Sequence, residues 1–446
     1  MIGLIRGEVQ PNVKGQERLP PRFWILTVLT GVVAGLGAIA MMETLRTVQH
    51  LAFHYHSGEF SAAVARVSDV RRLVMLTVGG LVTGLGLWAL TRYLGGTGGE
   101  PTQVVWTRSG HLSFGRTMLS GALSEMTVGF GGSIGREAAP QRFGAAGGSF
   151  IARTFRLTPD QTYVLIACGA GAGLAAVYNS PLAGALMAVE LYLGAISLNL
   201  LLPALLASGV ATAVSWLVLP ARAVYNVPAL PSPTLALIGF AILIGPLIGI
   251  ASAGYVALIG WASDHRPHGR LLILEPVLFF MILGVLAFRY PLLLGNGLDL
   301  AQFAFTGSAP LLVFAVLALL KPLATAGTLR SGASGGLFTP TMSFGAVLGV
   351  SLGRLWSFWL PGSPDATYGV LAAAAMMGAA MDAPATAVVF IMELTNRLLG
   401  VMVPALLAVV GATVTARYID HRSIYSARLA PEPTPADAAR TQERPS

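Results

Sequence analysis

An arginine and a glutamate open a short apolar segment in the middle of an otherwise uncharged part of the chain. The stretch reads Gly131-Gly-Ser-Ile-Gly-Arg136-Glu137. In a membrane-buried segment a charged side chain costs at least about 2.5 kcal/mol, so such residues usually face a cavity or a pathway. The free N–H groups and the dipole of a glycine-rich helix start attract an anion. A carboxylate there occupies the anion site itself until it is protonated or displaced. The alternative is a structural ion pair of Arg136 with Glu137 between a loop and a helix.

A second glycine-rich stretch opens another apolar segment. It reads Ser331-Gly-Ala-Ser-Gly-Gly-Leu337-Phe338-Thr339-Pro340. This order aims the backbone amides of Leu337 and Phe338 at whatever lies before the helix. Neutral dipoles suit a permeating ion, because a fixed positive charge would hold an anion too tightly for release. The alternative for this glycine cluster is a flexible turn.

Two further positions offer hydroxyl groups. Gly95-Gly-Thr97-Gly-Gly-Glu100-Pro101 follows a long apolar run, and Tyr425 follows the last one. The Thr97 hydroxyl is a candidate ion ligand, and the alternative is a simple turn. The alternative for Tyr425 is an aromatic residue of the membrane interface.

The composition indicates what kind of chain carries these segments. Of 446 residues, 54% are hydrophobic and 11% are charged, and the mean hydropathy is +0.70. A soluble domain carries about 25% charged residues, so this chain has too few charges to build a soluble surface. Together with 53 glycines, this predicts an all-α polytopic membrane protein. A transmembrane barrel would show short alternating segments instead of long apolar runs.

Other functional classes lack the residues that they need. Cys168 is the single cysteine, which excludes an internal disulfide and Cys-rich zinc or redox patterns. The formal charge of +8 comes without a long Lys/Arg run, so we expect no nucleic-acid partner. An intramembrane hydrolase needs a nucleophile with a base. None of the seven histidines lies in a long uncharged stretch, so we expect no enzyme, and no cofactor or metal.

Long and short apolar segments alternate along the chain. A helix needs about 20 apolar residues to cross a bilayer. The stretches long enough for this are Phe23–Met42, Leu73–Thr91, Leu191–Ala221, Ala223–Ser263, Leu300–Leu320 and Leu398–Ala416. Four shorter segments begin after a glycine cluster or at a proline: Ala138–Gly148, Pro181–Val189, Leu337–Val350 and Pro384–Met392. Helices that begin inside a membrane are tolerated where they line a polar cavity, and they are typical of a transporter's binding site.

The two halves of the chain repeat one another. Asn179-Ser-Pro181 leads to Glu190, and Asp382-Ala-Pro384 leads to Glu393, an offset of 203 residues. A second pair, Phe143-Gly-Ala and Phe344-Gly-Ala, recurs at an offset of 201 residues. Two pairs at almost the same offset predict an internal duplication, and duplicated halves with broken helices are a transporter or channel architecture.

These motifs together resemble those of the CLC family of chloride channels and chloride/proton antiporters, in its prokaryotic form without an appended regulatory domain. Four stretches carry the resemblance in the family's order and rough spacing: Gly95–Pro101, Gly135–Pro140, Gly336–Pro340 and Ser423–Tyr425. The two segments repeated around Pro181 and Pro384 support it. The resemblance covers about residues 20–429, nearly the whole chain.

The resemblance implies a CLC fold with two inverted-topology repeats and broken, partly re-entrant helices, in a homodimer with one pore per subunit. Residues 1–22 would form a cytoplasmic N-terminal segment, 23–426 the transmembrane domain and 427–446 a disordered cytoplasmic tail. Repeat one would span about 70–222 and repeat two about 232–420. The protein would be a multi-pass protein of the cell membrane with both termini cytoplasmic. The excess of Lys and Arg before the first span agrees with this orientation.

The resemblance also implies transport of chloride and similar small anions, bromide and nitrate among them, by a channel or a chloride/proton antiporter. Matched position by position, Glu137 would be the gating glutamate and Thr97 would replace an anion-coordinating serine. Leu337 and Phe338 would donate backbone amides, and Tyr425 a hydroxyl. Two alternatives stay open, a fluoride- or nitrate-selective member of the family and an unrelated broken-helix transporter of organic anions.

Three departures from the family's motifs bear on mechanism. Pro140 lies one residue later than in the family's Gly-Arg-Glu-Gly-Pro, and Glu100 is an acidic insertion relative to Gly-Ser-Gly-Ile-Pro. The position of the exchangers' inner proton-transfer glutamate falls on Leu191, which cannot carry a proton. Glu190 is one residue earlier, about 100° away around a helix. The sequence therefore leaves proton coupling open, with Glu190 or water as the candidate carriers.

Overall fold

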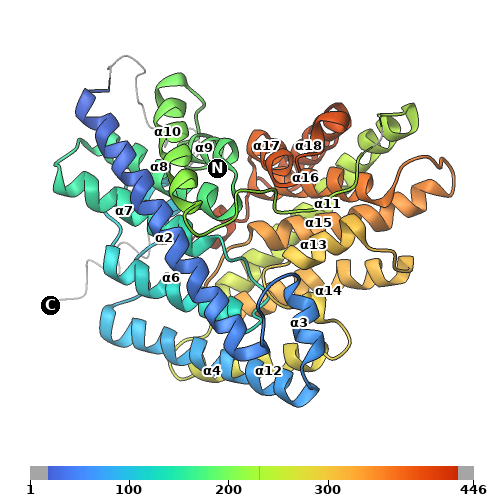
Figure 1. Cartoon of the computed structure of the whole chain (residues 1–446), viewed down its shortest axis with the longest axis horizontal. Coiled ribbons are helices and arrows are strands. Elements are labelled where there is room, and N and C mark those ends of the chain that lie inside the picture. The colour runs from blue at the N-terminus through green and yellow to red at the C-terminus, as the bar shows by residue number, and fades with distance from the viewer. Residues whose placement is uncertain (1–18, 231, 430–446) are drawn as a thin grey trace, which may run out of the picture.

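The computed structural model describes residues 19–230 and 232–429, and this part of the chain forms seventeen α-helices and no strand (Figure 1). In the first half these are α2 (Pro21–Phe53), α3 (Phe60–Arg66), α4 (Asp69–Leu94), α5 (Pro101–Trp106), α6 (Phe114–Gly129), α7 (Ala138–Thr154), α8 (Pro159–Tyr178), α9 (Pro181–Met187) and α10 (Leu198–Ser215), with a π-helical turn η1 (Ala188–Tyr192) after α9.

In the second half they are α11 (Leu235–Asp264), α12 (Leu271–Leu286), α13 (Leu298–Thr306), α14 (Leu311–Arg330), α15 (Phe338–Ser357), α16 (Asp365–Met381), α17 (Pro384–Thr395) and α18 (Met402–Ile419). Three short 3₁₀ turns complete it: η2 (Pro291–Leu293), η3 (Leu398–Val401) and η4 (Ser426–Arg428). Of the predicted N-terminal segment 1–22, residues 1–18 lie outside the described residues, and of the predicted tail 427–446, residues 430–446 do.

Seven of the described helices are long and apolar enough to cross a membrane: α2, α4, α8, α10, α11, α14 and α18. Most coincide with predicted stretches. The stretch Leu300–Leu320 is divided between α13 and α14, because Gly307 caps the end of α13 and Pro310 immediately precedes the start of α14. The sequence did not indicate α8, whose apolar window is 89% buried by its neighbours.

The predicted duplication is visible in matching helix ends. Asn179 ends α8 and Asp382 ends α16, and both adopt left-handed backbone angles, with φ of 52° and 56°. A proline then begins the next short helix in each half, α9 at Pro181 and α17 at Pro384. Proline suits the first helical position, because the N–H group that it lacks would have no partner there. The two repeats therefore use the same local sequence to break a helix at the same place.

The repeats also cap one another's short helices. The carboxylate of Glu190 accepts N–H groups from the second and third residues of α17 at 3.0 and 2.7 Å, and the Thr386 hydroxyl at 2.6 Å. The carboxylate of Glu393 accepts N–H groups from the second and third residues of α9 at 3.0 and 2.8 Å. Figure 1 shows α9 and α17 side by side. Because a negative charge at a helix N-terminus is favourable, this exchange joins the halves.

A second junction brings together the starts of α7 and α15. Gly135 and Gly336 exchange two backbone hydrogen bonds, with N···O distances of 2.6 and 2.8 Å, and form the isolated bridge of the described structure. The two residues are 201 positions apart, the offset of the second repeated pair. The N-termini of two helices from different repeats therefore meet at one point inside the protein.

A buried lysine fixes the loop before this junction. The Lys321 side chain is fully buried in α14, and its ammonium group donates to the hydroxyl of Ser133 at 2.9 Å. It also donates to the carbonyl oxygens of Leu293 and Gly295, at 3.3 and 3.1 Å. Three acceptors match the three donors of an ammonium group. The segment leading to Glu137 is thus tied to the second repeat.

Candidate functional site

The carboxylate of Glu137 lies at the start of α15. One oxygen, Oε1, accepts the backbone N–H of Phe338 at 2.7 Å. The other, Oε2, lies 3.1 Å from the hydroxyl oxygens of both Tyr178 and Thr339. We call these three donors the Glu137 seat. Glu137 is 1% exposed, so a buried negative group lies where a helix N-terminus attracts anions.

The hydrogens of the seat allow for either form of the carboxyl group. The Tyr178 and Thr339 hydroxyl oxygens lie 2.5 Å from one another as well as near Oε2 of Glu137. Two hydroxyl groups supply two hydrogens for these three contacts. A protonated Glu137 would supply the third. The same geometry therefore accommodates a carboxylate and, with one more hydrogen bond, a carboxylic acid.

Two glycines leave the space that the carboxyl group fills. A Cβ atom at Gly135 would lie 2.1 Å from Oε1 of Glu137, and a Cβ atom at Gly336 would lie 2.0 Å from it. These separations are far below contact distance, so neither position accepts a larger residue while Glu137 is seated. The glycines of both motifs are thus required by the close approach of this side chain.

Arg136 does not pair with its neighbour. Its guanidinium group lies over the ring of Tyr178, 5.2 Å from the ring centre, and among the described residues no ion pair joins it to Glu137. A cation over an aromatic face is attracted by the negative face of the ring. The alternative of an Arg136–Glu137 ion pair is therefore not what the structure adopts.

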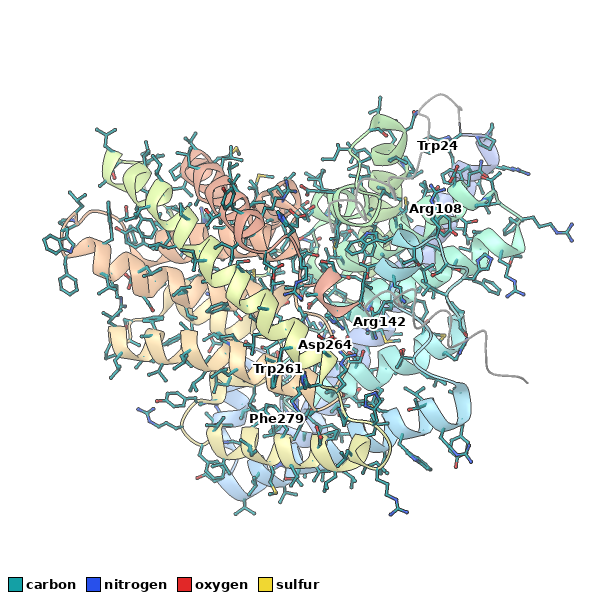
Figure 2. All side chains as sticks on the ribbon, turned by 180° about the vertical axis from the view of Figure 1, so that it is seen from behind. Trp24, Arg108, Arg142, Trp261, Asp264 and Phe279 are labelled. Atoms are coloured by element: carbon teal, nitrogen blue, oxygen red, sulfur yellow. The ribbon has the colours of Figure 1, made fainter. Side chains whose placement is uncertain are left out.

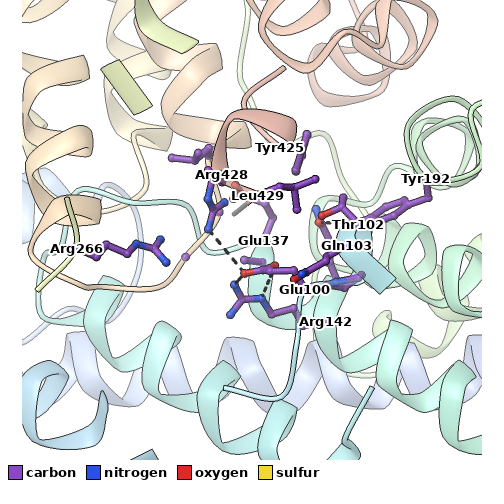
Figure 3. Close-up of a pocket in the computed structure, with 16 residues that line it drawn as sticks. Glu100, Thr102, Gln103, Glu137, Arg142, Tyr192, Arg266, Tyr425, Arg428 and Leu429 are labelled. Carbon is purple, nitrogen blue, oxygen red and sulfur yellow. Dashed lines mark hydrogen bonds and ion pairs between the residues drawn. The ribbon is translucent and has the colours of Figure 1, made fainter. Parts of the chain in front are cut away.

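A cavity of about 80 Å³ lies next to the seat, with room for several water molecules (Figure 3). We call it the central cavity. Of the predicted site residues, Glu137, Leu337 and Tyr425 line it together. Its wall also includes Glu100, Thr102, Gln141, Arg142, Tyr192, Arg266 and Arg428. Polar and charged side chains from distant parts of the sequence therefore converge on one cavity beside Glu137.

Tyr425 reaches the cavity from a turn after α18. The backbone N–H of Ile424 donates to the carbonyl of Ala380 in α16 at 2.8 Å, which fixes the turn. Before it, Arg422 pairs with Asp420 at 2.8 Å. Burial pushes the pKa of Asp420 upward, but its hydrogen bonds with Arg422 outweigh this and hold the pKa below its usual range. The C-terminal turn is thus held in place by both contacts.

Thr97 is not among the described residues that line the central cavity. Its carbonyl oxygen accepts a hydrogen bond from the Ser120 hydroxyl at 2.7 Å. The helix that follows, α5, begins only at Pro101, with Glu100 as its N-cap residue. The sequence has one extra residue before that proline, and Glu100 and Thr102, on either side of it, line the cavity.

Leu191 and Glu190 both lie away from the central cavity. Leu191 is 1% exposed, and its carbonyl accepts the indole N–H of Trp106 at 3.1 Å. The two carboxylate oxygens of Glu190 are engaged at the start of α17. Both residues belong to the π-helical turn η1, where the helical register is altered. Neither side chain contacts Glu137 in the described structure.

Comparisons with known proteins identify the family of the chain. A family model described as voltage gated chloride channel matches residues 99–417. The chain belongs to this family, the CLC family. The voltage-gated ClC-type chloride channel ClcB of Citrobacter koseri is 31% identical over 413 residues, 90% of this chain and 97% of that protein. ClcB of Salmonella typhi is 31% identical over 419 residues, again 90% and 97%.

Two solved CLC structures share the fold. A slow cyanobacterial Cl⁻/H⁺ antiporter superposes with a TM-score of 0.80 at 22% identity, over 92% of this chain and 97% of that one. A CLC-type fluoride/proton antiporter superposes with a TM-score of 0.74 at 22% identity, over 91% and 97%. The predicted CLC fold and family are confirmed.

Sequence reasoning missed several residues of this CLC site. Tyr178 is the last residue of α8, and nothing in the sequence before Asn179 marks it. Arg142 carried a signal, since it is a charge inside the apolar segment that follows Glu137. Arg266 and Arg428 are isolated charges in connecting segments, where the usual expectation is exposure to solvent. Within the described ranges, no group of three His, Cys, Asp or Glu side chains is arranged to hold a metal ion.

Proposed function

We propose that this CLC protein transports chloride and similar small anions across a membrane, through a pathway that Glu137 opens and closes. The observation that carries the proposal is the hydrogen bond of 2.7 Å from the Phe338 N–H to the Glu137 carboxylate. A backbone N–H at the start of an apolar helix is a neutral donor that binds an anion without retaining it. The carboxylate stands where such an anion would bind.

The mechanism follows from competition for the seat. While Glu137 is seated, its charge and volume exclude an anion from the start of α15. Protonation removes the charge, and an anion then competes for the Phe338 N–H. The central cavity next to the seat lets water and ions approach Glu137 from the Tyr425 side. Anion passage and protonation of one carboxyl group are therefore linked at a single position.

Replacing Glu137 by glutamine tests this gate. Glutamine keeps the shape of the side chain but cannot titrate, so Glu137→Gln should retain chloride flux in liposomes and lose its pH dependence, together with any proton movement coupled to it. Glu43→Gln serves as the control, because Glu43 is an exposed carboxylate paired with Arg46 on the surface. A Glu137→Gln protein with unchanged pH dependence would refute the assignment.

The anion is the second point to test. The relatives matched in sequence are named as chloride channels, and the structural neighbours as chloride/proton and fluoride/proton antiporters. We propose chloride as the main substrate, with bromide and nitrate also carried. Flux of chloride, nitrate, fluoride and a small carboxylate, compared in the same liposomes, separates this proposal from fluoride or nitrate selectivity. Transport of the carboxylate alone would favour an organic anion transporter.

Leu191 leads us to expect weak proton coupling. A leucine side chain cannot relay a proton, and Glu190, the neighbouring acid, is occupied at α17. Chloride-driven proton uptake into liposomes should therefore fall below that of CLC antiporters with an acid at this position. A tight exchange stoichiometry in the wild-type protein would contradict this expectation.

We also propose a homodimer in the cell membrane with both termini cytoplasmic. The dimer rests on the family resemblance, and the orientation on the excess of Lys and Arg before α2. The predicted roles of Thr97 and Tyr425 as anion ligands stay proposals as well. Mass measurement in detergent by light scattering tests the dimer, and protease access to the termini in sealed vesicles tests the orientation.

A further inference from the structure

Three arginines from separate elements surround the central cavity. Arg142 lies in α7, Arg266 in the connection after α11, and Arg428 in η4 (Figure 3). Seen from behind, Arg142 lies near the middle of the molecule, where the end of α11 at Asp264 reaches the first repeat (Figure 2). The carboxylates of the cavity wall are those of Glu100 and Glu137. Glu137 is already bound in its own seat. One carboxylate, that of Glu100, is therefore left to pair with three arginines.

Glu100 binds two of the three arginines. Arg142 donates to both carboxylate oxygens, from Nη2 to Oε1 and from Nε to Oε2, the latter at 3.2 Å. Nη2 of Arg428 lies 3.8 Å from Oε1. The Arg142 side chain is 3% exposed, whereas that of Glu100 is 39% exposed. The two-point contact is the geometry in which a guanidinium group holds an anion. Arg142 is thus held by two contacts, and Glu100 is more exposed than either arginine that it binds, since the Arg428 side chain is 13% exposed.

Arg266 has unpaired donor atoms beside the cavity. Two of its three guanidinium nitrogens, Nε and Nη2, are buried and make no hydrogen bond in the described structure. Leaving a buried charged donor unpaired is costly. Since Arg266 lines the central cavity with Arg142 and Arg428, an anion in this space would satisfy it.

We propose that Arg142, Arg266 and Arg428 form a second anion-binding site in the central cavity, and that the Glu100 carboxylate is its built-in occupant. The ligand is a small inorganic anion such as chloride. This inference rests on the proposed function, because it assigns a further site to the same pathway. The pathway then has two anion sites, the start of α15 and the three arginines. A carboxylate of the protein occupies each of them, Glu137 the first and Glu100 the second, and an incoming anion displaces it.

Displacement changes the proton affinity of Glu100. A carboxylate between guanidinium groups favours its charged form, and losing them to an anion favours protonation. The other titratable groups that face it are Glu137 across the cavity and the phenols of Tyr192 and Tyr425. Because Glu100 reaches water, the proton comes from solvent and converts the carboxylate to an acid. Anion binding at this site is thus accompanied by proton uptake at Glu100, a binding step that is separate from the opening and closing of the pathway by Glu137.

The Glu100→Gln variant tests whether the Glu100 carboxylate competes with an anion for the three arginines. With Glu137 intact throughout, calorimetric titration of the purified protein with chloride should show affinity about tenfold higher than in the wild type, because the competing charged hydrogen bonds are gone. The number of protons taken up per chloride, measured in buffers of different ionisation enthalpy, should fall. Asp365→Asn is the control, since Asp365 forms an ion pair with Arg354, is 34% exposed and lies outside the cavity. Unchanged affinity and unchanged proton uptake in Glu100→Gln would overturn the proposal.

Arg266→Gln tests the site from the other side without leaving a carboxylate unpaired. Chloride affinity should fall about tenfold, and thermal stability in chloride-free buffer should not fall, because the removed Nε and Nη2 donors had no partner. A loss of stability with unchanged chloride affinity would assign Arg266 to structure and refute the site. Chloride flux through the wild-type protein tests the proposed function separately. If the wild type carries chloride while both variants bind it normally, only this inference fails.

Discussion

Replacing Gly336 by alanine is expected to expel the Glu137 carboxylate from its seat and to leave the pathway open at every pH. A Cβ atom at this position would lie 2.0 Å from Oε1 and 2.3 Å from Cδ of Glu137. The backbone of Gly336 does not have a positive φ, so alanine fits the main chain and the bridge to Gly135 is retained. The glutamate side chain is the part that rotates away, because it is the end of a flexible chain.

Chloride flux in liposomes, measured as a function of pH, checks this result. Gly336→Ala should behave like Glu137→Gln, and combining the two should add nothing, because both remove the same competitor. Gly254→Ala in α11 is the matched control, since a Cβ atom there meets no other atom within 4 Å. Flux from Gly336→Ala that follows the wild-type pH profile would mean that the seat does not control the pathway.

The sequence pointed to the parts of the proposed gate because each part is local. Glycines, a glutamate and a helix start follow one another within ten residues at Gly131–Pro140, and the partner amide of Phe338 follows its own glycine cluster. Glu137 was indicated by its charge within an apolar segment. The Phe338 amide was indicated by its place at the start of a helix, where backbone N–H groups are free. The sequence could not indicate that the two motifs contact each other, since Gly135 and Gly336 meet only through the packing of two repeats.

The arginines around the central cavity were hidden for the same reason. Arg142, Arg266 and Arg428 belong to three segments that converge only in the folded chain. None of the three belongs to a motif that pairs it with the others, and charges in connecting segments, such as Arg266 and Arg428, are usually solvated. Thr97 shows the opposite limit. The family's motif favoured it, but one extra residue separates it from the helix start at Pro101. The spacing alone did not show which residue would face the cavity.

The consequences of the duplication were likewise only partly predictable from the sequence. Equal spacing related Glu190 to Glu393, and the broken helices were expected beside them. The spacing did not reveal that each glutamate binds the short helix of the opposite repeat. Through this exchange Glu190 stabilises the start of α17. It bears directly on whether Glu190 carries protons in place of Leu191.

Glu190→Gln and Glu393→Gln are expected to destabilise the protein by similar amounts, about 1.5–3 kcal/mol each. Each glutamate accepts two backbone N–H groups at a helix start, and an amide has one oxygen to offer in place of two. Thermal unfolding in detergent measures the loss. Because the two caps join the same pair of short helices, α9 and α17, the double variant should depart from additivity.

The same pair of variants decides the role of Glu190 in proton movement. Since both of its oxygens are bound at α17, we expect Glu190→Gln to retain whatever chloride-driven proton uptake the wild type has, just as Glu393→Gln does. Glu393 is the matched control, because it accepts the same two backbone N–H groups at the start of the opposite short helix and does not line the central cavity. Loss of proton uptake in Glu190→Gln alone, with its stability intact, would show that Glu190 carries the proton and that its contact with α17 opens during transport.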